Sequence, residues 1–172
     1  IHDTQMMFEI LKKLGCKVKR NNGKIIVNAS ELKSDEIPDD LMRQMRSSVI
    51  IVGAMLGRMK KAKFSYPRRM WYRSKTNRLT PKSIQRTWNT NIVCEVEKIV
   101  PTDIHLDFPS VGATENVMLL SVLAEGETKI INAAMEPEIV DLQNFLNKMG
   151  AKITGAGSNV IKITGVKKLK DI

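Results

Sequence analysis

An internal repeat is the sequence feature that most constrains the fold. The run Leu14–Val18 follows an amphipathic helical pattern over residues 4–14, and the similar run Met149–Ile153 follows a second such pattern over residues 138–149. In each run a glycine ends the helix and a strand begins. A hairpin pattern completes each copy, around Asn22-Gly23 in the first and residues 155–159 in the second. Repetition of one helix-and-hairpin unit predicts an α/β domain built from copies.

A second, shorter pair of similar segments extends the repeat toward the middle of the chain. Met55–Ser65 and Val122–Asn132 both have the pattern of a helix end, a polar turn and a strand. We expect a long helix from residue 39 or 40 through Leu56, in which small residues such as Gly53 permit close packing. The alternation in residues 63–66 predicts a strand.

Length and composition favour one well-packed domain. The chain has 172 residues with 42% hydrophobic content, and no apolar run reaches the roughly 20 residues of a membrane span. It begins with a helical pattern and without an initiator methionine, so we expect no signal peptide and a start inside a longer protein. Cys16 and Cys94 lack metal-ligand spacing, which favours a reducing cytoplasm and no metal site.

The net charge of +10 is concentrated in one stretch. Residues 41–94 contain 13 Lys or Arg and no Asp or Glu, whereas the rest of the chain has 15 basic and 18 acidic residues. Both tryptophans, Trp71 and Trp88, lie in the basic stretch. Basic residues interleaved with aromatics are typical of nucleic-acid binding, so that function class stays open at this point.

The stretch Asp107–Asn116 is the candidate ligand-binding motif. Pro109 and Gly112 break a preceding strand, and an apolar helical run follows over residues 117–123. Ser110, Thr114 and Asn116 are all suitable capping residues. A strand, a glycine-containing turn and a helix start aim backbone N–H groups at an anion, although the same pattern also serves as an ordinary helix cap.

The sequence of this stretch resembles the UDP-N-acetylglucosamine 1-carboxyvinyltransferase family. The same resemblance extends over residues 123–126, 132–141 and 145–153. The resemblance implies an α/β (α+β) fold, an inside-out α/β barrel domain with repeated units, and residues 1–172 as most of one such domain. It implies enolpyruvyl transfer from phosphoenolpyruvate to the 3′-hydroxyl of UDP-N-acetylglucosamine, with release of phosphate, in cytoplasmic peptidoglycan synthesis. It implies no metal or prosthetic group, no membrane association, and a missing second domain as partner.

The resemblance also implies a set of substrate-binding residues. Carried over onto this sequence they are Arg46, Ser110, Val111, Gly112 and Glu136. A solvated helix arginine is the alternative interpretation of Arg46. Glu138 also matches an acidic position of the family, but the favourable interaction of an acidic side chain with a helix N-terminus explains it without a binding role. Phe108 stands where some relatives carry lysine.

Residues 68–90 depart from the family pattern. They show no apolar residues at helical spacing, no alternation of apolar and polar residues, and no acidic residue. At this position the family has a glycine-rich loop with its catalytic cysteine, followed by a helix. A one-base shift of reading frame turns the codons of Met70-Trp71 into one for cysteine, and those of Trp71-Tyr72 and Trp88-Asn89 into glycine. We hypothesise a frameshift, assign no catalytic residue, and expect the chain alone to be inactive.

Two other functions are alternatives. One is a basic nucleic-acid-binding module that uses Arg68–Arg86 with Trp71 and Trp88. The shifted frame would remove most of its positive charge, which makes nucleic acid the less favoured partner. The other is a scaffold remnant with no activity of its own.

Overall fold

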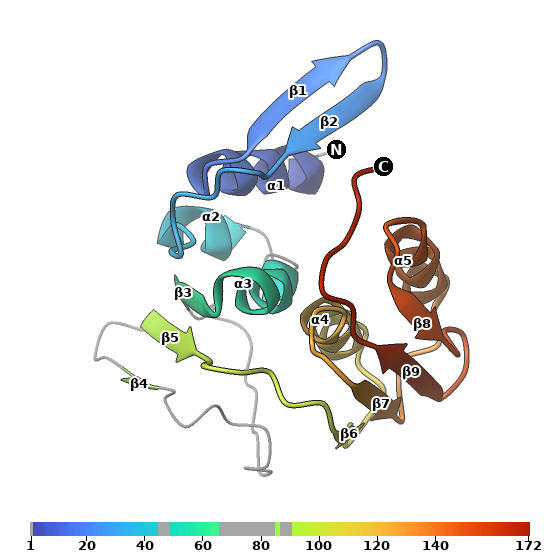
Figure 1. Cartoon of the computed structure of the whole chain (residues 1–172). Helices are drawn as coiled ribbons and strands as arrows, with labels where there is room; N and C mark the ends of the chain where they lie inside the picture. Colours follow the sequence, from blue (N-terminus) through green and yellow to red (C-terminus); the bar gives the residue numbers. More distant parts are fainter. Residues whose placement is uncertain (1, 45–48, 66–84, 87–90) are drawn as a thin grey trace. The chain divides into compact units, whose positions relative to one another are not determined.

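The computed structural model describes residues 2–44, 49–65, 85–86 and 91–172 (Figure 1). The chain forms two compact units. Unit 1 comprises Ile1–Val49 and Lys61–Glu95, and unit 2 comprises Ile50–Lys60 and Val96–Ile172. The predicted ligand Arg46 and nearly all of the anomalous segment 68–90 lie outside the described residues.

Unit 1 begins with the predicted helix and hairpin. Helix α1 (His2–Lys13) is followed by strands β1 (Lys17–Asn21) and β2 (Lys24–Asn28), which pair antiparallel. Asn22 and Gly23 connect the strands with positive φ angles of 46° and 77°, as the twist of a two-residue hairpin requires.

The second part of unit 1 is a short sheet. Helix α2 (Asp39–Gln44) precedes strands β3 (Lys61–Ser65), β4 (Gln85–Arg86) and β5 (Asn91–Glu95), which lie in the order β3-β5-β4. Of the long helix expected through Leu56, the structure describes α2 and helix α3 (Ile51–Met59), which belongs to unit 2, and residues 45–48 between them lie outside the described residues.

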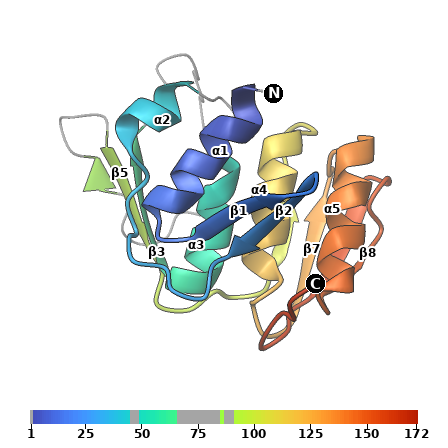
Figure 2. The same cartoon turned by 90° about the horizontal axis from the view of Figure 1, so that it is seen from above.

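Unit 2 contains a complete repeat copy. Its elements are β6 (Asp103–His105), α4 (Val111–Ser121), β7 (Glu127–Ile131), α5 (Pro137–Lys148), β8 (Lys152–Thr154) and β9 (Val160–Thr164). The strands lie in the order β6-β7-β9-β8, with β6 and β7 parallel and the other pairs antiparallel. Figure 2 shows α3, α4 and α5 side by side within this unit.

The core of unit 2 lies between the sheet and its helices. Strand β9 alternates, because Ile161 and Ile163 are fully buried whereas Lys162 between them is exposed. Ile130 of β7 and Ile139 of α5 are also completely buried in this cluster. Apolar residues at every second position of a strand, or at helical spacing, thus form the buried face of each element.

The helix-to-strand turn is the same in the first and last copies. The amide of Cys16 donates to the carbonyl of Leu11 at 2.9 Å, and the amide of Ala151 donates to that of Leu146 at 3.0 Å. These pairs occupy corresponding positions in the two runs that the sequence matches, so the predicted repeat is confirmed in backbone hydrogen bonding.

The parallel pairing at the start of a copy also recurs. The amide of Lys63 donates to the carbonyl of Asp35 at 2.7 Å, and the amide of Lys129 donates to that of Thr102 at 3.3 Å. The order β3-β5-β4 in unit 1 therefore corresponds to β7-β9-β8 in unit 2. Both sheets have the topology of one repeated unit.

The first copy has an open edge in the described part of the chain. There β2 pairs with β1 alone, whereas its counterpart β9 lies between β7 and β8. Ile25 and Val27 of β2 are each 45% exposed, although Ile161 and Ile163, their counterparts, are 0% exposed. The missing neighbours explain why apolar side chains of β2 face solvent.

Candidate functional site

Two segments of unit 2 lie at the carboxyl ends of its parallel strands. Residues 106–112 follow β6 and lead into α4, and residues 132–138 follow β7 and lead into α5. We call them together the carboxyl edge. The carboxyl ends of neighbouring parallel strands meet at one side of a sheet, which is where ligands bind in open α/β folds.

Ser110 forms the start of α4. It has the extended backbone of an N-cap residue (φ −128°, ψ 118°), and its Oγ accepts a hydrogen bond from the amide of Ala113 at 3.4 Å. The predicted helix cap is therefore present, and Thr114 and Asn116, which the sequence also offers, do not fill that role.

Gly112 leaves the surface at the start of α4 open. A Cβ atom placed there would have no neighbour within 4 Å, and the residue is exposed. First-turn amides of a helix lack intrahelical acceptors, so they can donate to a ligand that approaches this surface. The helix dipole favours an anionic group at the same place.

Two side chains connect the segments of the carboxyl edge. The buried Thr114 accepts a hydrogen bond at its Oγ1 from the amide of Ala134 at 3.1 Å. Asn132, whose φ is 62°, donates from Nδ2 to the carbonyl of Leu106 at 2.9 Å. The segments that lead into α4 and α5 are thus held together by two side chains, each bonded to a backbone group of the other segment.

Glu136 occupies the N-cap position of α5. Its backbone is extended (φ −62°, ψ 152°), its side chain makes no capping hydrogen bond, and it is exposed. The structure therefore places Ser110, Val111, Gly112 and Glu136 on the carboxyl edge, as helix-start residues of α4 and α5. Arg46, the remaining predicted ligand, lies outside the described residues.

The carboxyl edge is locally acidic. Burial raises the pKa of Glu115, and the nearby Glu138 carboxylate raises it further. The stretch from Asp107 to Asn116 contains no lysine or arginine. Backbone amides and neutral side chains are therefore the groups that this stretch can offer to an anion.

Thr114 and Asn116 have hydrogen-bond partners that the sequence did not predict. Asn116 accepts at Oδ1 from the amide of Gly53 at 2.8 Å, across 63 positions of sequence. Thr114 reaches Ala134 across 20 positions. Small polar residues in a helix start suggest local capping, and only the packing of α3, α4 and α5 reveals these longer-range bonds.

Metal ligands do not gather in the described part of the chain. Among those residues no group of three or more His, Cys, Asp or Glu side chains could hold a metal ion. No described helix has the length and apolar character that a membrane crossing requires.

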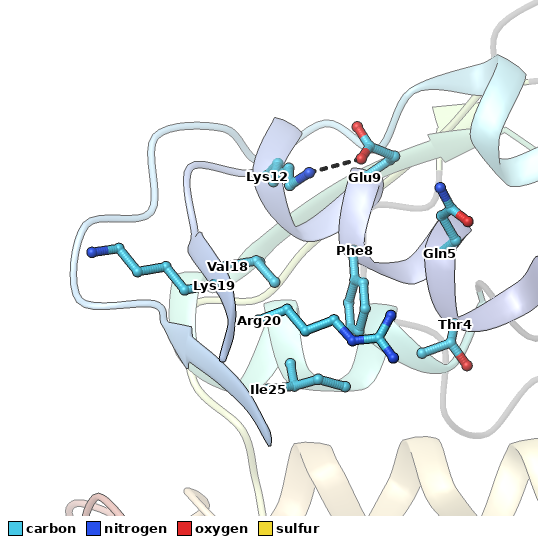
Figure 3. A pocket seen from close by; sticks show the side chains of 9 residues that line it. All are labelled: Thr4, Gln5, Phe8, Glu9, Lys12, Val18, Lys19, Arg20 and Ile25. Atoms are coloured by element: carbon cyan, nitrogen blue, oxygen red, sulfur yellow. Dashed lines mark hydrogen bonds and ion pairs between the residues drawn. The ribbon is translucent and has the colours of Figure 1, made fainter. Parts of the chain in front are cut away.

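Unit 1 has a pocket of about 570 Å³ between α1 and the β1–β2 hairpin (Figure 3). Apolar Phe8, Val18 and Ile25 line it, and Lys12 forms an ion pair with Glu9 at 2.9 Å at its side. It borders the open strand β2. We assign the pocket to the incomplete first copy and not to the candidate site.

Unit 2 combines a sheet of repeated strands with two helix starts at one edge, and comparison with known families identifies this arrangement. The family model of EPSP synthase (3-phosphoshikimate 1-carboxyvinyltransferase) matches residues 1–67 and 82–172. The chain belongs to this family.

Similarity to individual enzymes is more specific than the family match. The chain is 49% identical, over 99% of its length, to UDP-N-acetylglucosamine 1-carboxyvinyltransferase 2 of Caldanaerobacter subterraneus subsp. tengcongensis. It is 42% identical, over 100% of its length, to UDP-N-acetylglucosamine 1-carboxyvinyltransferase 1 of Symbiobacterium thermophilum. It spans only 42% of the length of each relative.

Solved structures confirm the enolpyruvyl transferase fold. The enolpyruvyl transferase NikO from Streptomyces tendae superposes with a TM-score of 0.77 at 19% identity, covering 97% of this chain and 41% of that one. EPSP synthase from Acinetobacter baumannii gives a TM-score of 0.69 at 19% identity, covering 98% and 40%. The repeated α/β units predicted from the sequence are those of this fold.

Proposed function

We propose that this chain is the nucleotide-sugar-binding part of a UDP-N-acetylglucosamine 1-carboxyvinyltransferase. The whole enzyme would transfer enolpyruvyl from phosphoenolpyruvate to the 3′-hydroxyl of the sugar and release phosphate. That reaction is the first committed step of peptidoglycan synthesis, in the cytoplasm. The partner of this chain would be the remaining part of the same enzyme.

The open start of α4 is the observation that carries this proposal. Ser110 caps the helix, and Gly112 leaves room for a ligand to approach first-turn amides. Such a site suits the diphosphate of a nucleotide sugar. Val111, half-buried between them, can contact an apolar part of the nucleotide, and Glu136 can accept a hydrogen bond from a hydroxyl.

Calorimetric titration of the chain with UDP-N-acetylglucosamine tests the binding function. We expect saturable binding that weakens with Ser110→Ala, because the cap that orders the helix start is lost. Asn147→Ala, at the far end of α5, is the control. Absence of binding up to millimolar ligand would overturn the proposal for this chain.

We further propose that the chain alone does not catalyse the reaction. Proton delivery to the C3 carbon of the reacting enol group needs a positioned acid. The cysteines of the sequence, Cys16 and Cys94, are both buried and lie away from the carboxyl edge along the chain. Phosphate release from phosphoenolpyruvate and UDP-N-acetylglucosamine should equal that of a protein-free blank, and a rate above the blank would contradict inactivity.

The frameshift over residues 68–90 is a separate proposal, and the repeat supports it. Between β3 and β4 there are 19 residues (66–84), and between their counterparts β7 and β8 there are 20 (132–151), which include α5. A helix of the repeat is therefore expected at this position. The family model leaves residues 68–81 unmatched and matches the chain on both sides, so it supports the frameshift for residues 68–81 and not for residues 82–90.

The coding DNA across residues 67–91 tests the frameshift directly. We expect the shifted frame to spell a glycine-rich loop with cysteine and arginine, followed by an amphipathic helix. A shifted frame without that loop would refute the idea. Salt-dependent retention of the chain on DNA would instead favour the nucleic-acid-binding alternative.

A further inference from the structure

Asn116 joins the starts of two helices of unit 2 by two hydrogen bonds. Its Oδ1 accepts from the amide of Gly53 in α3 at 2.8 Å. Its Nδ2 donates to the carbonyl of Gly112, one turn earlier in α4, also at 2.8 Å. One amide side chain therefore bonds to a backbone donor of α3 and to a backbone acceptor at the candidate site.

The bond to Gly53 acts as a cap supplied by another helix. Gly53 is the third residue of α3, in the turn whose amides lack intrahelical partners. Ile50, at the N-cap position, provides no side-chain hydrogen bond. Asn116 takes the role that a serine or aspartate at position 50 would otherwise fill.

Close packing of the backbones fixes this arrangement. A Cβ atom on Gly53 would lie 2.3 Å from the carbonyl oxygen of Asn116, and one on Gly57 would lie 3.2 Å from that of Leu119. Successive turns of α3 thus pack on successive turns of α4, so the two helices run parallel. Their N-termini, and the positive ends of their dipoles, lie at the same end of unit 2.

We propose that Asn116 is a positioning residue for nucleotide-sugar binding. It holds the Gly112 carbonyl, and with it the ligand-facing turn Ser110–Gly112, at a fixed place relative to the start of α3. This inference rests on the proposed function, because it assumes that the turn contacts the nucleotide sugar. A loosened turn would lose affinity because ligand binding would have to order it.

Two substitutions separate the two bonds. Asn116→Ala removes both, whereas Asn116→Asp keeps an acceptor for the Gly53 amide and loses the donor to Gly112. Asn147→Ala is a matched control, since Asn147 also makes two bonds to backbone groups, at 2.8 and 2.9 Å, both to Ile153. Asn147 lies in the last turn of α5, away from the carboxyl edge.

The experiment combines titration with UDP-N-acetylglucosamine, denaturant unfolding and amide hydrogen exchange of the full chain. We expect Asn116→Ala and Asn116→Asp to weaken binding about tenfold, while Asn147→Ala lowers stability comparably and leaves affinity within about twofold. Exchange of the Gly53 amide should accelerate in Asn116→Ala and remain slow in Asn116→Asp. Wild-type affinity in either Asn116 variant, or equal weakening by Asn147→Ala, overturns the proposal.

Failure of the proposed function has a different signature. If the wild-type chain does not bind the nucleotide sugar, both the proposed function and the role of Asn116 in binding are refuted. Hydrogen exchange then still decides whether Asn116 holds the two helix starts. Faster exchange at Gly53 in Asn116→Ala but not in Asn116→Asp, with faster exchange at Ala113 in both variants, supports the positioning, and unchanged exchange refutes it.

Discussion

The buried hydroxyl of Thr114 accepts a hydrogen bond from the amide of Ala134 at 3.1 Å and so joins the start of α4 to the segment before α5. Both residues are fully buried, at 0% exposure. A buried amide that loses its acceptor carries its full desolvation cost. This one bond therefore contributes to the geometry of the whole carboxyl edge.

Thr114→Val should destabilise the chain by about 1–3 kcal/mol, because it keeps the shape and leaves the Ala134 amide unpaired. Denaturant unfolding measures the change. Thr114→Ser keeps the hydroxyl and should keep the Ala134 amide slow in hydrogen exchange, in contrast to Thr114→Val. Equal protection of that amide in both variants would show that the bond is unimportant.

Gly53→Ala should destabilise the chain substantially, by about 1–3 kcal/mol, since the added Cβ would lie 2.3 Å from a backbone oxygen and force α3 and α4 apart. Gly112→Ala is the matched helix control. Its Cβ has no neighbour within 4 Å, so it should be neutral or stabilise by up to about 1 kcal/mol. Similar unfolding midpoints for the two variants would contradict the close packing of the helices.

Local signals predicted a large share of this fold. Gly15 and Gly150 end their helices, Asn22-Gly23 turns the first hairpin, and Ser110 caps α4, each through a preference of the residue itself. Contacts across many residues were not predictable. The Asn116–Gly53 bond spans 63 positions, and Gly53 alone indicates only that a helix can approach closely.

The candidate site was predictable in part. Ser110, Val111, Gly112 and Glu136 were expected from the family resemblance, and the parallel strands β6 and β7 explain why they share one edge. The contribution of Thr114 was not expected, because a threonine in a helix start is typical of a cap. Its side chain is instead buried against the next repeat segment.

Stability should depend on the charge of Glu115. Burial and then Glu138 raise its pKa above the ordinary value of 4.5, so the native state binds more protons than the unfolded state as this group titrates. The free energy of unfolding consequently falls as pH rises through that interval. Glu115→Gln should be more stable than the wild type at pH 7.

This advantage should disappear below pH 4.5, where Glu115 becomes protonated in both states. Urea unfolding at a series of pH values measures it. The exposed Glu125, replaced by Gln, is the control from the same unit. A pH-independent difference between Glu115→Gln and the wild type would mean that the charge of Glu115 has no part in it.

The most direct measurement is an NMR titration of the isotope-labelled chain with UDP-N-acetylglucosamine, which locates the ligand as well as detecting it. We predict saturable shifts of the Ser110, Val111 and Gly112 amides, with the hairpin β1–β2 unaffected. Shifts confined to residues outside the carboxyl edge, or none at millimolar ligand, would contradict the assignment of this chain as the nucleotide-sugar-binding part of the enzyme.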